Sequence, residues 1–113
     1  MSSDRYQKLV REIDRLAESL DEERSPLVPE VTRLQSWFQT EILGADFADL
    51  DRRRQSYTTE IHKQLRLLAT DAAFLQSARQ ETKQAQRRSQ IRDRLSTIRR
   101  YCNVILGKDE EQQ

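Results

Sequence analysis

The stretch from Ser56 to Arg79 constrains the fold more than any other part of the chain. It contains neither glycine nor proline, and residues of good helix propensity fill it. Placed at about 100° per residue, its apolar side chains form two stripes, whereas an ordinary surface helix has one. The first stripe comprises Tyr57, Ile61, Leu65, Leu68, Ala72 and Leu75, and the second comprises Leu67, Phe74 and Ala78. We therefore expect a central helix that contacts neighbours on two sides.

Two polar residues, Gln64 and Asp71, fall between these stripes, one heptad apart. We expect both to be structural polar residues of the core. A carboxylate in such a position must be paired, because a buried unpaired charge costs several kcal/mol. Asp71 is therefore predicted to bind an arginine of a neighbouring helix. The candidates are Arg94, Arg99 and Arg100.

The composition favours helices over sheets. The chain has 113 residues, the length of one domain, with 35% hydrophobic and 35% charged residues but only two glycines and two prolines. So few turn residues disfavour a sheet, and the lean core favours long solvated helices with a partner that completes their burial. No apolar run resembles a signal peptide or a membrane span, and the single Cys102 has no partner for an internal disulfide. We expect a cytoplasmic protein.

Apolar residues also recur at intervals of three and four outside the central stretch. The spacing predicts helices near residues 4–22, 26–43, 50–79 and 83–106. Ser25 is expected to cap the second helix, and Asp49 or Asp51 the third. Gly44 is expected to be a C′ stop of the second helix, and Gly107 is expected to end the fourth.

The boundary between the last two helices is ambiguous. Gln80 to Gln90 contains no proline or glycine, and Ala85 is its only apolar residue. Either the chain turns near Arg79 to Thr82, with Thr82 as the cap, or one helix continues to Leu106. We favour the turn, because a single long helix would leave both stripes short of intrachain partners.

The predicted fold class is all-α. We expect an antiparallel four-helix arrangement of two helical hairpins with a long central third helix. Residues 1–106 would form a single helical domain, and 107–113 a frayed acidic tail.

Residues suited to catalysis or to cofactor binding are scarce. The chain has one histidine, His62, on the side of its helix that is expected to face solvent, and one cysteine, Cys102, within an apolar stripe. A cysteine in such a stripe is far more often a small buried hydrophobe than a nucleophile. Two such residues make no zinc site, and two glycines leave no phosphate-binding loop. We expect no enzymatic activity, no cofactor and no metal.

Charge is distributed unevenly along the chain. Residues 1–51 contain 6 lysines and arginines against 12 aspartates and glutamates, whereas residues 52–106 contain 13 against 4. One interpretation is intramolecular: an acidic hairpin lies on a basic one, with Glu12, Glu18 or Glu30 pairing the arginines. The other interpretation is a basic face for an acidic partner.

The arginines of the fourth helix fall on both flanks of its apolar stripe. Arg88, Arg92 and Arg99 form one flank, called the arginine ridge below, and Arg87 and Arg94 form the other. We take the ridge, with Arg87, as the candidate partner-binding site.

Trp37 is a further partner-binding candidate. It lies at the edge of the second helix's stripe, so it is either a core-edge residue or a half-exposed anchor for a partner. A basic ridge also fits nucleic acid, but aromatic residues that could stack on bases are absent from it. We therefore favour an acidic protein surface, or self-association, over nucleic acid.

Three parts of the chain resemble the cyanobacterial heterocyst-frequency control protein PatD family. They are the run QSYTTEIHKQLRLLATDAAFLQSARQ, the upstream WFQTEIL, and RYCNVIL near the C-terminal end. The likeness spans Leu34 to Leu106 and is densest from Gln55 to Arg79, and no catalytic motif anchors it. It implies a small, cytoplasmic, all-helical regulator that binds the tubulin-like division GTPase FtsZ and bundles its filaments.

The resemblance also links the protein to cell division and, in filamentous species, to heterocyst frequency. Cross-linking of filaments needs at least two binding surfaces, which a homodimer would supply. A nucleic-acid- or chromosome-associated basic helical protein is the alternative function. No contact with a membrane is expected.

Overall fold

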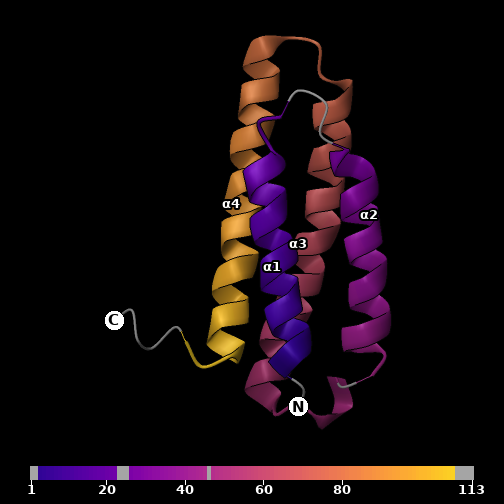
Figure 1. Cartoon of the computed structure of the whole chain (residues 1–113), viewed down its shortest axis with the longest axis vertical. Helices are drawn as coiled ribbons and strands as arrows, with labels where there is room; N and C mark the ends of the chain where they lie inside the picture. The colour runs from indigo at the N-terminus through magenta and orange to yellow at the C-terminus, as the bar shows by residue number, and fades with distance from the viewer. Residues whose placement is uncertain (1–2, 23–25, 46, 109–113) are drawn as a thin grey trace.

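The computed structural model describes residues 3–22, 26–45 and 47–108, which form an antiparallel bundle of four α-helices (Figure 1). The helices are α1 (Ser3–Ser19), α2 (Leu27–Phe38), α3 (Arg52–Ser77) and α4 (Glu81–Ile105). A π-helical turn, Gln39–Leu43, continues α2, and a 3-10 turn, Phe47–Asp49, precedes α3. These residues contain no strand, so the all-α prediction is confirmed.

The four helices alternate in direction, and helices adjacent around the bundle differ in how closely they pack. The most extensive interface is between α3 and α4, followed by α2 with α3 and α1 with α4, whereas α1 and α2 contact each other least. The α3–α4 turn lies beyond the ends of α1 and α2 (Figure 1). The bundle is therefore a tightly packed α3–α4 hairpin with α1 and α2 laid along it.

The boundaries of α3 and α4 follow local chemistry. Asp51 is the N-cap of α3, and its carboxylate accepts a hydrogen bond of 2.8 Å from the backbone N–H of Arg54. Helix α3 ends at Ser77, and α4 begins after Gln80, which confirms a turn between two helices. The prediction that Thr82 caps the fourth helix is wrong, because the N-cap of α4 is Gln80, two residues earlier. The expected cap Ser25 lies outside the described residues.

The two glycines end their helices differently. Gly107 follows the end of α4, as predicted, and adopts a left-handed φ of 77°. Its N–H donates to the carbonyl of Val104 at 3.1 Å, and the N–H of Lys108 donates to Asn103 at 2.8 Å, which is the Schellman pattern. Gly44 has a right-handed φ of −81° instead, and its N–H closes the π-helical turn at 2.9 Å. Gly44 therefore ends the helical segment as predicted, but with a right-handed backbone. The predicted tail residues 109–113 lie outside the described part of the chain.

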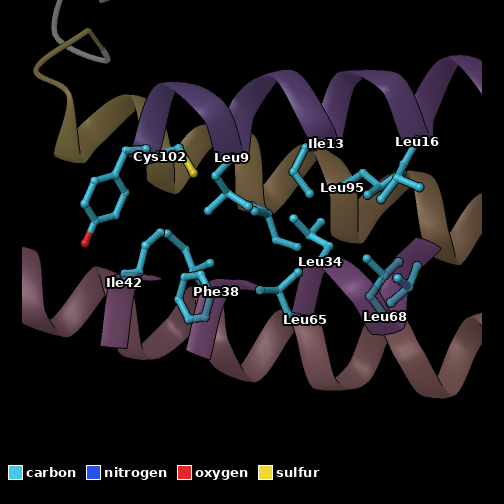
Figure 2. Close-up of a cluster of buried hydrophobic side chains, with 14 of the residues drawn as sticks. Leu9, Ile13, Leu16, Leu34, Phe38, Ile42, Leu65, Leu68, Leu95 and Cys102 are labelled. Atoms are coloured by element: carbon cyan, nitrogen blue, oxygen red, sulfur yellow. The ribbon is translucent and has the colours of Figure 1, made fainter. Parts of the chain in front are cut away.

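One apolar cluster fills the bundle, with side chains from all four helices directed into a shared interior (Figure 2). Fully buried members include Leu9, Ile13, Phe38, Leu65, Leu68 and Ile98. A hydrogen bond crosses this interior: the hydroxyls of Tyr6 on α1 and Thr58 on α3 are 2.9 Å apart. Thr58 has no exposed surface, and the apolar pattern of the sequence did not mark it as a core residue.

The second stripe of α3 is not buried as expected. Leu67 and Phe74 keep 37% and 49% of their surface exposed. Both α2 and α4 pack on the broad first stripe, which alone is wide enough for two neighbours. The second stripe lies further round the helix, so these two side chains turn outward. The prediction that α3 contacts neighbours on two sides is confirmed by α2 and α4, but Leu67 and Phe74 of the second stripe are not buried by them.

Candidate protein-interaction surface

The buried stripe of α4 divides its arginines into two flanks, as the sequence predicted. The stripe consists of Ile91, Leu95, Ile98, Cys102 and Ile105, all buried. The arginine ridge borders α1, since Arg92 and Arg99 reach carboxylates of the α1 segment. Arg87 and Arg94 border α3, where both approach Asp71. The two flanks therefore have different neighbours and different environments.

The arginine ridge is partly paired within the fold. Arg92 binds the carboxylate of Asp21, and Arg99 Nε lies 3.0 Å from Asp14 Oδ1. The partners are aspartates instead of the glutamates that we predicted. Asp14 lies on α1 and Asp21 just after it, and these are the carboxylates that the two arginines reach. The side chains of Arg92 and Arg99 remain 47% and 52% exposed. Exposed ion pairs of this kind contribute about 0–1 kcal/mol each, so the ridge keeps accessible positive charge.

Arg88, the third residue of the ridge, differs from the other two. It is half-buried, and its Nε atom has no hydrogen-bond partner among the described residues. It lines a hollow between the end of α1, the start of α2 and the α3–α4 turn. Arg88 is therefore less accessible to a partner than Arg92 and Arg99.

The other flank contains the polar cluster predicted around Asp71. Arg94 Nε donates to Asp71 Oδ2, and Arg94 Nη1 donates to Gln64 Oε1 at 3.4 Å. Arg87 Nη1 lies 3.7 Å from the other carboxylate oxygen. Asp71 is 4% exposed. The predicted pairing of Asp71 is confirmed with Arg94, and the other two candidates, Arg99 and Arg100, take no part in it.

Arginine–aromatic pairs recur along the outward side of the α3–α4 hairpin. The guanidinium of Arg87 lies 4.5 Å from the ring centroid of Phe74, within cation–π range. Arg53 lies 5.7 Å from the ring of Tyr57, and Arg100 lies 5.6 Å from that of Tyr101. The two tyrosine rings contact each other, with centroids 5.4 Å apart. The tyrosine pair packs partly against the core, whereas Leu67 and Phe74 are exposed. We call the exposed surface around Leu67, Phe74 and Arg87 the outer face.

Sequence reasoning missed the outer face because it assigned Leu67 and Phe74 to the core. A signal for it was present in the second stripe. That stripe has only three members and lies about 100° from the first, so it could have been interpreted as a surface.

Trp37 is half-buried against the core, at the predicted edge of the α2 stripe. The ammonium of Lys8 lies 5.1 Å from its ring centroid. Both residues line a hollow of about 220 Å³ between α1 and α2. These are the two adjacent helices with the smallest interface. The rest of the lining is mostly charged and consists of Glu12, Arg15, Glu30 and Arg33, together with Leu16 and Leu34. Trp37 is accessible from this hollow.

The environments of Cys102 and His62, the two side chains considered for catalysis, are typical of structural residues. Burial raises the pKa of the Cys102 thiol to about 12, so it stays protonated at neutral pH. Burial, and then the charge of Arg66, lower the pKa of His62, whose ring stacks on Phe38. Within residues 3–22, 26–45 and 47–108, no group of three or more His, Cys, Asp or Glu residues could hold a metal. The same residues include no helix long and apolar enough to cross a membrane.

The geometry defines a four-helix bundle whose α3–α4 hairpin presents arginines on two flanks. No protein-family model, curated protein or solved structure matches the chain.

Proposed function

We propose that this protein is a non-catalytic cytoplasmic regulator that binds an acidic protein filament through its α3–α4 hairpin. From the resemblance to the PatD family, we propose that the filament is the division GTPase FtsZ and that binding bundles it. The role would lie in cell division and, in a filamentous source, in heterocyst frequency.

One observation supports the proposal most: the positive charge of α3 and α4 is not neutralised by the helices packed on them. Together α3 and α4 contain 12 lysines and arginines against four aspartates and glutamates. In α1 there are four basic and four acidic residues, and in α2 one of each. Of the acidic residues that the structure describes in the first half, five lie in α1 and α2 and five lie outside these helices. The first hairpin pairs Arg92 and Arg99 of the ridge through Asp21 and Asp14, and both arginines keep about half of their side chains exposed.

A basic surface of this kind suits an acidic polymer in two ways. Opposite charge accelerates the encounter between protein and filament, and repeated subunits along the filament allow many weak contacts to add up. Bundling further requires each particle to reach two filaments. We propose that a homodimer supplies the second site, since two-fold symmetry duplicates any binding surface.

Co-sedimentation with FtsZ filaments assembled with GTP tests the proposal. We expect the protein to pellet with filaments and to remain in solution without them. A charge-reversed variant of the ridge, Arg88→Glu with Arg92→Glu and Arg99→Glu, should bind more weakly with its helicity retained. The matched control reverses three basic residues of α1: Lys8→Glu, Arg11→Glu and Arg15→Glu.

A duplex-DNA gel shift at the same salt concentration tests the alternative function. A shift of DNA without pelleting by filaments would contradict the proposal and favour nucleic acid. If the protein pellets with filaments and the ridge variant binds as wild type does, filament binding stands but the ridge is not the site. Variants of Trp37 and Phe47 would then be tested.

A further inference from the structure

Leu67 and Phe74 are the two large hydrophobic residues that the described part of the chain leaves exposed. They lie on one side of α3, two helical turns or about 10 Å apart. Single exposed hydrophobic residues need no explanation. Phe74, however, lies under the guanidinium of Arg87, 4.5 Å from its ring centroid. Aromatic residues and arginine are the types enriched at protein interfaces.

Arg87 has the geometry to bind an incoming carboxylate beside Phe74. Its guanidinium lies over the Phe74 ring at 4.5 Å, and 42% of its side chain is exposed. Among the residues that the structure describes, its only ion pair is the long 3.7 Å approach to Asp71, whose second oxygen binds Arg94. A guanidinium has five N–H donors. Arg87 therefore retains donors that the fold does not use, next to an exposed aromatic ring.

The charge of the outer face indicates what covers it. Helix α3 contains two carboxylates, and each has a close partner: Glu60 lies 3.2 Å from Lys63, and Asp71 binds Arg94. The positive charge of Arg87 is therefore left in excess. A second copy across a two-fold axis would oppose this surface with itself, and like charges across an interface are unfavourable. An acidic partner would instead be attracted.

We infer that the outer face binds an acidic protein segment that carries two apolar side chains about 10 Å apart. A carboxylate of the segment binds Arg87, and its apolar side chains pack on Phe74 and Leu67. The inference rests on the proposed function for the identity of the partner and adds the anchoring surface and the chemistry of the segment. The arginine ridge, on the other flank of α4, attracts the same partner at longer range.

Filament binding by point variants tests this anchor. Phe74→Ser and Arg87→Gln should each weaken co-sedimentation with FtsZ filaments by about 30-fold or more, the loss typical of a hot-spot residue. Phe74→Leu keeps an apolar side chain and should stay within about threefold of wild type. Arg11→Gln removes an exposed arginine of α1 and is the matched control for Arg87→Gln. Circular dichroism verifies that each variant is folded.

A peptide titration identifies the surface without the filament. The probe is a peptide of about 15 residues, made of glutamate and alanine with two leucines seven positions apart, and the control peptide has lysine for every glutamate. In ¹⁵N-labelled protein, the acidic peptide should shift the amide signals of Leu67, Phe74 and Arg87. The basic peptide should not.

The two measurements separate this inference from the proposed function. If wild type and both variants bind filaments equally, the anchor is elsewhere and the inference is overturned, while filament binding stands. If wild type does not bind filaments, the proposed partner is wrong. The peptide then decides: shifts on the outer face support the inference, and their absence overturns it. A wild-type dimer that Phe74→Ser converts to a monomer would also overturn it, because a second copy would then be the occupant.

Discussion

Arg94 of α4 donates its Nε–H to the buried carboxylate of Asp71 on α3, linking the two longest helices beside the core. The Arg94 side chain is only 18% exposed. The contact with Gln64 at 3.4 Å engages a second nitrogen of the same guanidinium. Each charge of this pair is thus compensated by a specific partner and not by solvent.

Replacing Asp71 by alanine should therefore destabilise the fold by about 3 kcal/mol, because it leaves Arg94 partly buried without its counter-charge. Urea unfolding followed by circular dichroism measures this loss. Asp93→Ala is the control: Asp93 is an exposed aspartate of α4 without an ion pair in the described structure, and its loss should cost less than about 0.5 kcal/mol. Equal effects of the two substitutions would contradict the importance of the pair.

This pair shows how far the sequence determines the fold. The three-and-four spacing of apolar residues was sufficient to predict four helices and an apolar stripe on α4 with arginines on both flanks. It also placed Asp71 where only a paired carboxylate is stable. These features depend on periodicity within one helix, which is a local property of the chain.

Features that depend on two distant segments were not predictable in the same way. Thr58 looks polar in the pattern, and its buried position depends on Tyr6, 52 residues earlier. The exposure of Phe74 depends on which side of α3 the other helices occupy. Likewise, the charge totals indicated an acidic first half, but they did not reveal that α1 and α2 each have a net charge of zero. The candidate surface was therefore predicted in part, through its arginines and not its apolar anchors.

The pH dependence of stability should include a contribution from His62. Burial and Arg66 lower its pKa below the ordinary 6.5, so the unfolded chain binds the proton more tightly. The contribution is fully present above pH 6.5 and is lost as the pH falls from there through the folded-state pKa. His62 is the only histidine, so an NMR titration of its ring reports the pKa directly. A measured pKa at or above 6.5 would be inconsistent with the packing described for this ring.

Cys102 should be protected from thiol reagents in the folded protein. Its pKa is raised from 9.0 to about 12 by burial, and a thiol reacts as the thiolate. Its contribution to stability is fully present below pH 9 and is lost as the pH rises toward 12. Cys102→Ala should lack this alkaline loss relative to wild type. Fast labelling of the native protein by a disulfide reagent at mildly alkaline pH would refute the prediction.

The two glycines should tolerate alanine poorly for different reasons. Gly107→Ala should cost about 1–2 kcal/mol from its left-handed backbone alone, since nothing lies within 4 Å of the added carbon. Gly107→Asn should cost less, because asparagine tolerates this conformation better. At Gly44 the added carbon would lie 2.7 Å from the carbonyl oxygen of Thr40, so Gly44→Ala should force the backbone to shift. Thermal melting of the three variants tests this; an unchanged melting temperature for Gly107→Ala would count against the left-handed turn.

We propose above that this four-helix protein binds FtsZ filaments through exposed basic charge and cross-links them. Right-angle light scattering of GTP-assembled filaments tests it most directly, with the protein added stepwise at rising salt. We predict that scattering increases with protein concentration and that the increase diminishes steeply above about 150 mM salt, where charges are screened within about 8 Å. Scattering that stays at the level of filaments alone, at every protein and salt concentration, would contradict the claim.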